Sequence, residues 1–216
     1  MTSRWPPTSE PAERLLDSLR HQPLLVVLRP RTPIEAAPQL ERLRDLGLRH
    51  VEIAWNHHPD WSEQCRELGR RFPTLALGAA SVCDEAGVKA SAAAGFRYVV
   101  SPVLERSLLE AAAALDLTLV PGVMTPSEVH RARSWGCGMV KLFPAATLGP
   151  GYWSRLRGPL GEPLPFCIAA GGIRPSEVLG WLDAGVDAVA LGSGLGEDLG
   201  VLKEVVWGII SKSQDA

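Results

Sequence analysis

The pentapeptide GLRHV at residues 47–51 recurs in outline as GFRYV (95–99), GCGMV (136–140) and GVDAV (185–189). These four copies of the pattern G-x-x-x-V begin 48, 41 and 49 residues apart, about twice the length of one strand-plus-helix unit with short loops. Glycine commonly ends a helix in the left-handed conformation, and an apolar run follows each glycine here. Each copy therefore predicts the end of a helix and the start of a strand.

Four further apolar runs alternate with these copies, which makes eight short predicted strands in all. They cover residues 24–28, 74–77, 118–120 and 166–169. The segments between strands have helical length, and Pro33, Pro126 and Pro175 stand near their first positions, where proline is favoured. Apolar strands that alternate with helices predict a parallel sheet that is covered on both faces or closed on itself. Eight units with a fourfold repeat favour an α/β fold of the closed (β/α)8 TIM-barrel type over an open doubly wound sheet.

The length and composition of the chain fit one domain. With 216 residues, 46% of them hydrophobic and 21% charged, the chain can bury one large core without disulfides or a structural metal. An amphipathic helix is expected at about residues 10–20, in front of the first strand. We therefore expect a flexible arm at residues 1–9, a single barrel domain at residues 10–210 and a tail at residues 211–216.

Charge and cysteine usage argue against several classes of function. The net charge of −2 and the isoelectric point near 6.2 do not indicate a basic surface that would bind nucleic acid or an anionic membrane. The first residues contain no long apolar run and no stretch of 18 apolar residues follows, so we expect neither a secretory signal nor a membrane span. The four cysteines lie far apart, which indicates reduced thiols in a cytoplasmic protein. His57 and His58 are adjacent and lack metal-ligand spacing, so we expect a polar loop and no metal site.

Two charged residues interrupt apolar strands at equivalent positions of the repeat. Five residues beyond the repeat glycines stand Glu52, Val100, Lys141 and Ala190, which would form one layer of a barrel interior. Glu52 and Lys141 belong to the second and sixth strands, which face each other across the barrel. A lysine among apolar side chains has a lowered amine pKa and becomes a nucleophile for carbonyl carbons, and a nearby carboxylate can shuttle protons. The pair therefore favours catalysis over the structural alternative, a buried salt bridge that only fills the barrel.

Two glycine-rich phrases follow the last two predicted strands. They are AAGGIRPSE (169–177) and ALGSGLGED (190–198). The loops after strands seven and eight of such barrels often bind phosphate through backbone N–H groups and a helix N-terminus. The candidate phosphate-binding residues are Gly171, Gly172, Gly192 and Ser193, with plain turns as the alternative. Arg29 ends the first strand and could meet a second anionic group of the substrate or form a salt bridge at the rim.

Seven short phrases carry a resemblance to a known family. They are VVLRP (26–30), VEI (51–53), LGAASV (77–82), VSP (100–102), VPGVMTPSE (120–128), VKLFPA (140–145) and AGGIRP (170–175). In this order they resemble the class I 2-keto-3-deoxy-6-phosphogluconate and 4-hydroxy-2-oxoglutarate (KDPG/KHG) aldolases, from about Pro23 to Gly194. VKLFPA is similar to the Schiff-base motif of that family.

The resemblance implies a role for each of the residues already placed in the barrel. Lys141 would form the imine with pyruvate or the 2-keto acid, Glu52 would be the general acid/base, and Arg29 would contact the substrate. The other implied substrate-binding residues are Asn56, Ser81, Pro102, Phe143 and Ala170, and the glycines after strands seven and eight would hold phosphate. Enzymes of this family are typically homotrimers and need no metal or other cofactor.

Three positions depart from the pattern of the family. Asn56 stands where the family usually has an arginine that grips the keto-acid carboxylate. Ala170 replaces a threonine, and Ser81 replaces another threonine but keeps the hydroxyl. Losing an arginine–carboxylate contact without replacement costs about 2–4 kcal/mol of binding or transition-state energy. Either Arg29 or another group compensates, or the substrate differs.

The function expected from these residues is that of a Schiff-base aldolase. It would cleave a 2-keto-3-deoxy (phospho)sugar acid, such as 2-keto-3-deoxy-6-phosphogluconate or 4-hydroxy-2-oxoglutarate, into pyruvate and an aldehyde. Two alternatives stay open. One is a phosphate-binding barrel lyase or isomerase that acts on another sugar phosphate, and the other is a non-catalytic member that binds a metabolite.

Overall fold

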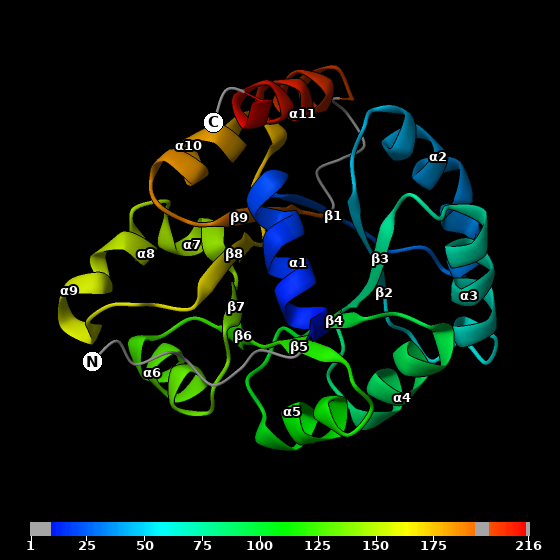
Figure 1. The fold of residues 1–216 in the computed structure, drawn as a ribbon, viewed down its shortest axis with the longest axis horizontal. Helices are drawn as coiled ribbons and strands as arrows, with labels where there is room; N and C mark the ends of the chain where they lie inside the picture. Colours follow the sequence, from blue (N-terminus) through cyan, green and yellow to red (C-terminus); the bar gives the residue numbers. More distant parts are fainter. Residues whose placement is uncertain (1–9, 193–198, 215–216) are drawn as a thin grey trace.

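The computed structural model describes residues 10–192 and 199–214, and it shows a ring of strands surrounded by helices (Figure 1). Strands and helices alternate along the chain. The predicted arm at residues 1–9 and the candidate phosphate-binding residue Ser193 lie outside the described residues, as do residues 215–216 of the predicted tail.

The described residues contain nine parallel strands in one sheet, in the order β5-β4-β3-β2-β1-β9-β8-β7-β6. The strands are β1 (Leu24–Leu28), β2 (His50–Ala54), β3 (Ala76–Ala80), β4 (Tyr98–Val100), β5 (Thr118–Val120), β6 (Gly122–Val123), β7 (Met139–Leu142), β8 (Phe166–Ala170) and β9 (Ala188–Leu191). The two ends of this order, β5 and β6, are consecutive in the chain and are separated only by Pro121. Because β5 pairs with β4 and β6 pairs with β7, they are two halves of one barrel strand. The predicted eight-stranded barrel is confirmed.

One predicted strand begins later than its apolar run. Residues 74–77 predict a strand, but β3 begins only at Ala76 and continues to Ala80. The N–H of Leu75 donates to the carbonyl of Phe72 at 3.0 Å, so the first two residues of the predicted strand belong to a turn. The predicted strand at residues 118–120 is also longer than expected, because it resumes as β6 after Pro121, which has no N–H to donate to the sheet.

The helices cover the outside of the barrel, with the exception of α1. They are α1 (Glu10–His21), η1 (Pro33–Ala36), α2 (Ala37–Asp45), α3 (Trp61–Arg71), α4 (Glu85–Ala94), α5 (Arg106–Ala113), α6 (Pro126–Ser134), α7 (Ala145–Leu148), α8 (Tyr152–Arg155), α9 (Arg157–Leu160), η2 (Pro175–Glu177), α10 (Val178–Asp183) and α11 (Leu199–Gln214). The repeat glycines Gly47, Gly95, Gly136 and Gly185 all have positive φ, between 82° and 98°. The sequence pattern therefore marked the ends of four helical segments correctly.

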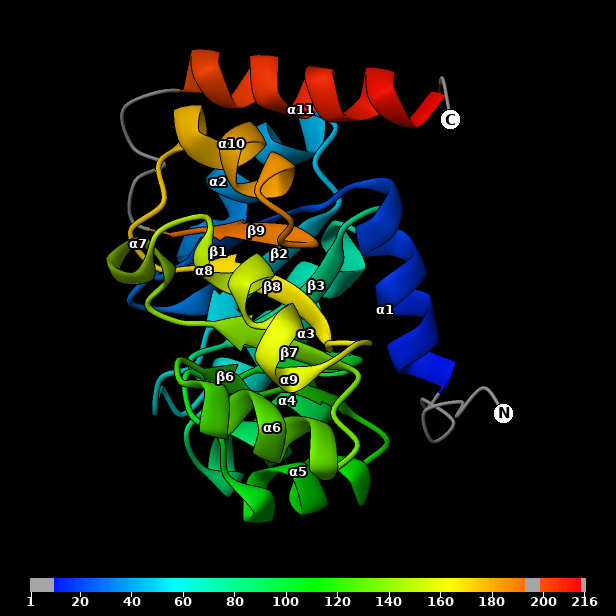
Figure 2. The ribbon, with the colours of Figure 1, turned by 90° about the vertical axis from the view of Figure 1, so that its left-hand side faces the viewer.

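Helix α1 closes the N-terminal end of the barrel. Figures 1 and 2 show it lying across this end rather than beside the outer helices. Its buried residues Ala12, Leu15 and Leu19 pack with the inward-facing strand residues, and Ser18 shares a hydrogen bond of 2.8 Å with His50 at the start of β2. The opposite, C-terminal end is thereby left as the face on which barrel loops can build a site. None of the helices in the described part of the chain is long and apolar enough to cross a lipid bilayer.

Candidate active site

Glu52 and Lys141 project into the barrel from opposite sides. Each is the third residue of its strand, β2 and β7. The neighbours of Glu52, Val51 and Ile53, pack in the outer apolar cluster between strands and helices, as do the residues on either side of Lys141. Because successive strand residues point to opposite faces, the two charged side chains face inward. They are 1% and 3% exposed, respectively.

Burial shifts the pKa values of both groups toward neutral pH. It raises the pKa of Glu52 to about 7, although the positive charges of Lys141 and Arg29 act in the opposite direction. Burial also lowers the pKa of Lys141, and the negative charge of Glu52 partly offsets this effect. Among the ion pairs of the described residues, none closer than 4.0 Å joins Glu52 to Lys141. The pair is therefore electrostatically coupled without being a contact salt bridge.

Phe143 holds the Lys141 amine from one side. The Nζ atom of Lys141 lies 4.6 Å from the centroid of the Phe143 ring, within the range of a cation–π contact. The N–H of Phe143 donates to the carbonyl of Val123 at 3.0 Å, which fixes the backbone after β7. A Cβ atom at Gly171 would lie only 2.9 Å from two carbons of the same ring. Phe143 is therefore close both to the Lys141 amine and to the loop that follows β8.

Arg29 and Ser81 meet at the C-terminal ends of β1 and β3. Arg29 Nη1 donates a hydrogen bond of 2.8 Å to Ser81 Oγ, and the Ser81 backbone has φ of 60°. The guanidinium side chain is exposed, and its charge acts on both Glu52 and Lys141. A cation with remaining donor capacity therefore lies at the mouth of the barrel beside the buried pair.

The Asn56 side chain is hydrogen-bonded to two loops of the protein. Its Nδ2 donates to the carbonyl oxygens of Arg31 and Pro30, at 3.1 and 3.4 Å, and its Oδ1 accepts from the N–H of His58 at 3.1 Å. The side chain therefore braces the loop after β1 against the loop after β2. Unlike the arginine expected at this position, Asn56 carries no charge, and its side-chain amide is hydrogen-bonded within the protein.

Pro102 and Ala170 border the same end of the barrel. Ala170 is the last residue of β8 and packs in the inner cluster, where it is 4% exposed. Pro102 follows β4, and its backbone lies close to Gly122. A Cβ atom at Gly122 would lie only 2.3 Å from the carbonyl group of Pro102. Neither residue contributes a polar side chain to this end of the barrel.

The glycines after β8 and β9 leave the barrel side by side, because these two strands are paired. Gly171 and Gly172 have φ of 95° and 81°, and the N–H of Ala146 donates to the carbonyl of Gly171 at 3.1 Å. Gly192 follows β9 directly and is half-buried. Gly171 is close to the Phe143 ring, which in turn lies beside Lys141. Ser193 is outside the described residues.

Tyr98 is a further inward-facing residue, and it is not among the site residues predicted from the sequence. Tyr98 is 4% exposed and packs in the inner cluster with Val100, two residues later. The available signal was the strand alternation itself, since the residue two places before an inward-facing one also faces inward. The loop with His57 contains no metal-ligand cluster: within residues 10–192 and 199–214 no three His, Cys, Asp or Glu side chains form one. His57 Nε2 instead lies 3.7 Å from the Asp84 carboxylate.

Comparisons with known proteins agree with this geometry. The family model described as "KDPG and KHG aldolase" matches residues 15–212. The chain is 32% identical over 178 residues to 2-dehydro-3-deoxy-6-phosphogalactonate aldolase of Escherichia coli K12, which covers 82% of this chain and 84% of the relative. It is 30% identical over 137 residues to 2-dehydro-3-deoxy-phosphogluconate aldolase of Dickeya dadantii, 63% of each chain.

A solved structure gives the same result. The KDPG aldolase of Legionella pneumophila, whose structure holds pyruvate as a covalent carbinolamine intermediate, superimposes with a TM-score of 0.72 at 25% identity. The match covers 92% of this chain and 95% of that one. The family model spans nearly the whole barrel, and the relatives within it are aldolases, that is, carbon–carbon lyases. This chain belongs to the KDPG and KHG aldolase family.

Proposed function

We propose that this aldolase cleaves a phosphorylated 2-keto-3-deoxy sugar acid into pyruvate and an aldehyde through an imine on Lys141. The observation that carries the proposal is the buried pair inside the barrel. Burial lowers the pKa of the Lys141 amine and raises that of Glu52 to about 7. An amine that holds its proton less tightly than a free lysine and an acid/base that titrates near neutral pH are what imine chemistry needs.

The steps follow from these two groups. The Nζ atom of Lys141 attacks the C2 carbonyl, and the resulting carbinolamine takes up a proton and loses water to give the protonated imine. Glu52 takes the proton of the C4 hydroxyl, the C3–C4 bond breaks, and its electron pair moves toward the imine nitrogen to form an enamine. The aldehyde leaves, Glu52 returns its proton to C3, and water releases pyruvate and free Lys141.

The remaining predicted residues would position the substrate. Arg29, with Ser81 beside it, would bind the carboxylate in place of the arginine that Asn56 replaces. Phe143, Pro102 and Ala170 would shape the apolar wall around the keto acid. The backbone N–H groups of the loops after β8 and β9, at Gly171, Gly172, Gly192 and Ser193, would bind the phosphate at the other end.

We favour 2-keto-3-deoxy-6-phosphogalactonate as the substrate and 2-keto-3-deoxy-6-phosphogluconate as the second candidate. The relative named for the galactonate compound is 32% identical across 82% of the chain, whereas relatives named for the gluconate compound are 30% identical across 63% of it and 27% identical across 92% of it. The two compounds differ in the configuration of C4, the carbon whose hydroxyl Glu52 would deprotonate. Comparing kcat/KM for the two at equal enzyme concentration tests this preference.

Borohydride trapping tests the proposed imine directly. Incubation with pyruvate and borohydride should add one reduced pyruvate to Lys141, as located by peptide mass spectrometry. A Lys141→Ala variant should show no adduct, and Lys89→Ala, which removes an exposed helical lysine, should retain it. Absence of an adduct from wild type with every keto acid tried would overturn the imine. Turnover that survives Lys141→Arg but not Glu52→Gln would indicate enolisation by Glu52 instead.

We also infer a cytoplasmic homotrimer. Membership of the family supports the trimer, and the four free cysteines, three of them buried, support a reducing compartment. Light scattering should give the mass of three 23.2 kDa chains. A mass of one or two chains would contradict the trimer.

A further inference from the structure

Tyr98 lies beside Glu52 in the barrel interior but has no part in the proposed chemistry. The partner of Glu52 in register on β3 is Gly78, which has no side chain. A Cβ atom at Gly78 would lie 2.3 to 2.7 Å from three carbons of the Tyr98 ring. The ring therefore covers Gly78 and fills the space next to Glu52 that a β3 side chain would otherwise occupy.

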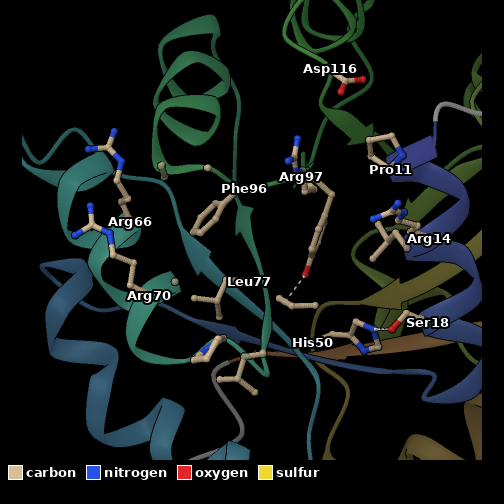
Figure 3. Close-up of a pocket in the computed structure, with 18 of the residues that line it drawn as sticks. Pro11, Arg14, Ser18, His50, Arg66, Arg70, Leu77, Phe96, Arg97 and Asp116 are labelled. Atoms are coloured by element: carbon tan, nitrogen blue, oxygen red, sulfur yellow. Dashed lines mark hydrogen bonds between the residues drawn. The ribbon is translucent and has the colours of Figure 1, made fainter.

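On its other side Tyr98 borders a cavity at the N-terminal end of the barrel, shown in Figure 3. The cavity has a volume of about 830 Å³ and lies between α1, α3 and the starts of β2, β3 and β4. Arg14 and Arg97 line it, as does His50. Tyr98 Oη is 3.5 Å from the carbonyl oxygen of Ala76, so the hydroxyl points toward this end of β3. A space of this size with charged groups at its edge can hold water.

Burial has a larger effect on the charge state of Glu52 than the positive charges near it. Lys141 from β7 and Arg29 after β1 favour the carboxylate, and burial favours the neutral acid. The Glu52 charge also acts on the Tyr98 phenol from β4, whose pKa is raised by burial first and by that charge second. His50, on the same strand as Glu52, has its pKa lowered to about 4 by burial and is neutral at pH 7. Water that reached Glu52 from the cavity at the N-terminal end would favour the ionised carboxylate over the neutral acid.

We propose that Tyr98 is a positioning residue for Glu52, because its ring forms the floor of the active site and separates the Glu52 carboxyl from the cavity at the N-terminal end. Its effect on turnover rests on the proposed function, whereas its effect on Glu52 does not. The separation is made by the ring rather than by the hydroxyl, whose nearest hydrogen-bond contact, at 3.5 Å, is long.

A carboxyl titration in the free protein tests the proposal without any substrate. The protein is labelled with 13C at glutamate carboxyl groups, and the Glu52 resonance is assigned from its absence in Glu52→Gln. In Tyr98→Leu the floor is opened, so the pKa of Glu52 should fall by about 1 unit or more. Tyr98→Phe is the matched control that keeps the ring, and its titration should coincide with that of wild type. Gly78→Ala is a second variant, which displaces the ring without changing Tyr98.

Each outcome either supports or contradicts the proposal that the Tyr98 ring forms the floor of the active site. A Glu52 titration that is unchanged in both Tyr98→Leu and Gly78→Ala would overturn the proposal, and so would a shift in Tyr98→Phe as large as in Tyr98→Leu. If Tyr98→Leu does not fold, as judged by thermal melting, Gly78→Ala decides alone. The acidic limb of the kcat profile should move to lower pH together with the titration. A shifted titration in a protein without aldolase activity would refute the proposed function and leave the role of Tyr98 intact.

Discussion

Replacing Gly171 by alanine probes how tightly the loop after β8 packs against the proposed catalytic lysine. Gly171 has φ of 95°, a conformation that costs an alanine about 1–2 kcal/mol. The new Cβ would also lie 2.9 Å from two carbons of the Phe143 ring and 3.2 Å from the Cα of Pro144. These distances are about 0.3 to 0.6 Å shorter than the shortest favourable carbon contact, near 3.5 Å. Overpacking of this kind costs about 1–3 kcal/mol more.

Gly95→Ala is the matched control for this substitution. Gly95 has φ of 85°, but nothing lies within 4 Å of the position where its Cβ would be. The control therefore carries only the conformational cost of about 1–2 kcal/mol, and Gly171→Ala should lose about 2–5 kcal/mol in total. Urea unfolding followed by circular dichroism gives both free energies of unfolding, provided that the m-values stay equal.

The same substitution should also slow the trapping of pyruvate. The new Cβ would displace the Phe143 ring, and the Nζ atom of Lys141 lies 4.6 Å from the centroid of that ring. The rate at which borohydride captures the adduct should therefore fall in Gly171→Ala and stay unchanged in Gly95→Ala. Equal losses of stability in the two variants would refute the close packing of Gly171 on Phe143.

Two further predictions concern Glu52 and Asn56. Glu52 binds its proton more tightly in the folded protein, with a pKa of about 7, than in the unfolded chain, where 4.5 is expected. Stability should therefore fall by about 3 kcal/mol as the pH rises from 4.5 through 7, and urea unfolding should show this slope in wild type but not in Glu52→Gln. Asn56→Ala removes the amide that braces the loops after β1 and β2. Losing about 1.4 kcal/mol of positioning for Arg29 should raise KM on the order of tenfold, and an unchanged KM would show that the brace does not serve binding.

Local patterns were sufficient to predict the architecture of this protein. The glycines at 47, 95, 136 and 185 mark helix ends because a positive φ is a local property of the backbone, and all four have it. The count from these glycines placed Val100 and Ala190 in the inner cluster of the barrel. The strand at residues 74–77 was misplaced because apolar character does not distinguish a turn residue such as Leu75 from a strand residue. The split of the fifth strand at Pro121 follows from the missing N–H, a signal that was present in the sequence.

The sequence by itself determined the eight-unit barrel, the pair Glu52 and Lys141 at equivalent repeat positions, and the glycines that follow the last two strands. These features depend on residue type and spacing along a single strand or turn. Only the tertiary structure decided that Asn56 bonds to the loop after β1, that Arg29 meets Ser81, and that Gly171 lies close to the Phe143 ring. Only the structure placed Tyr98 over Gly78 beside Glu52. Such contacts join residues on different strands, so they depend on how the closed barrel brings those strands into register, which the order of residues along one strand does not specify.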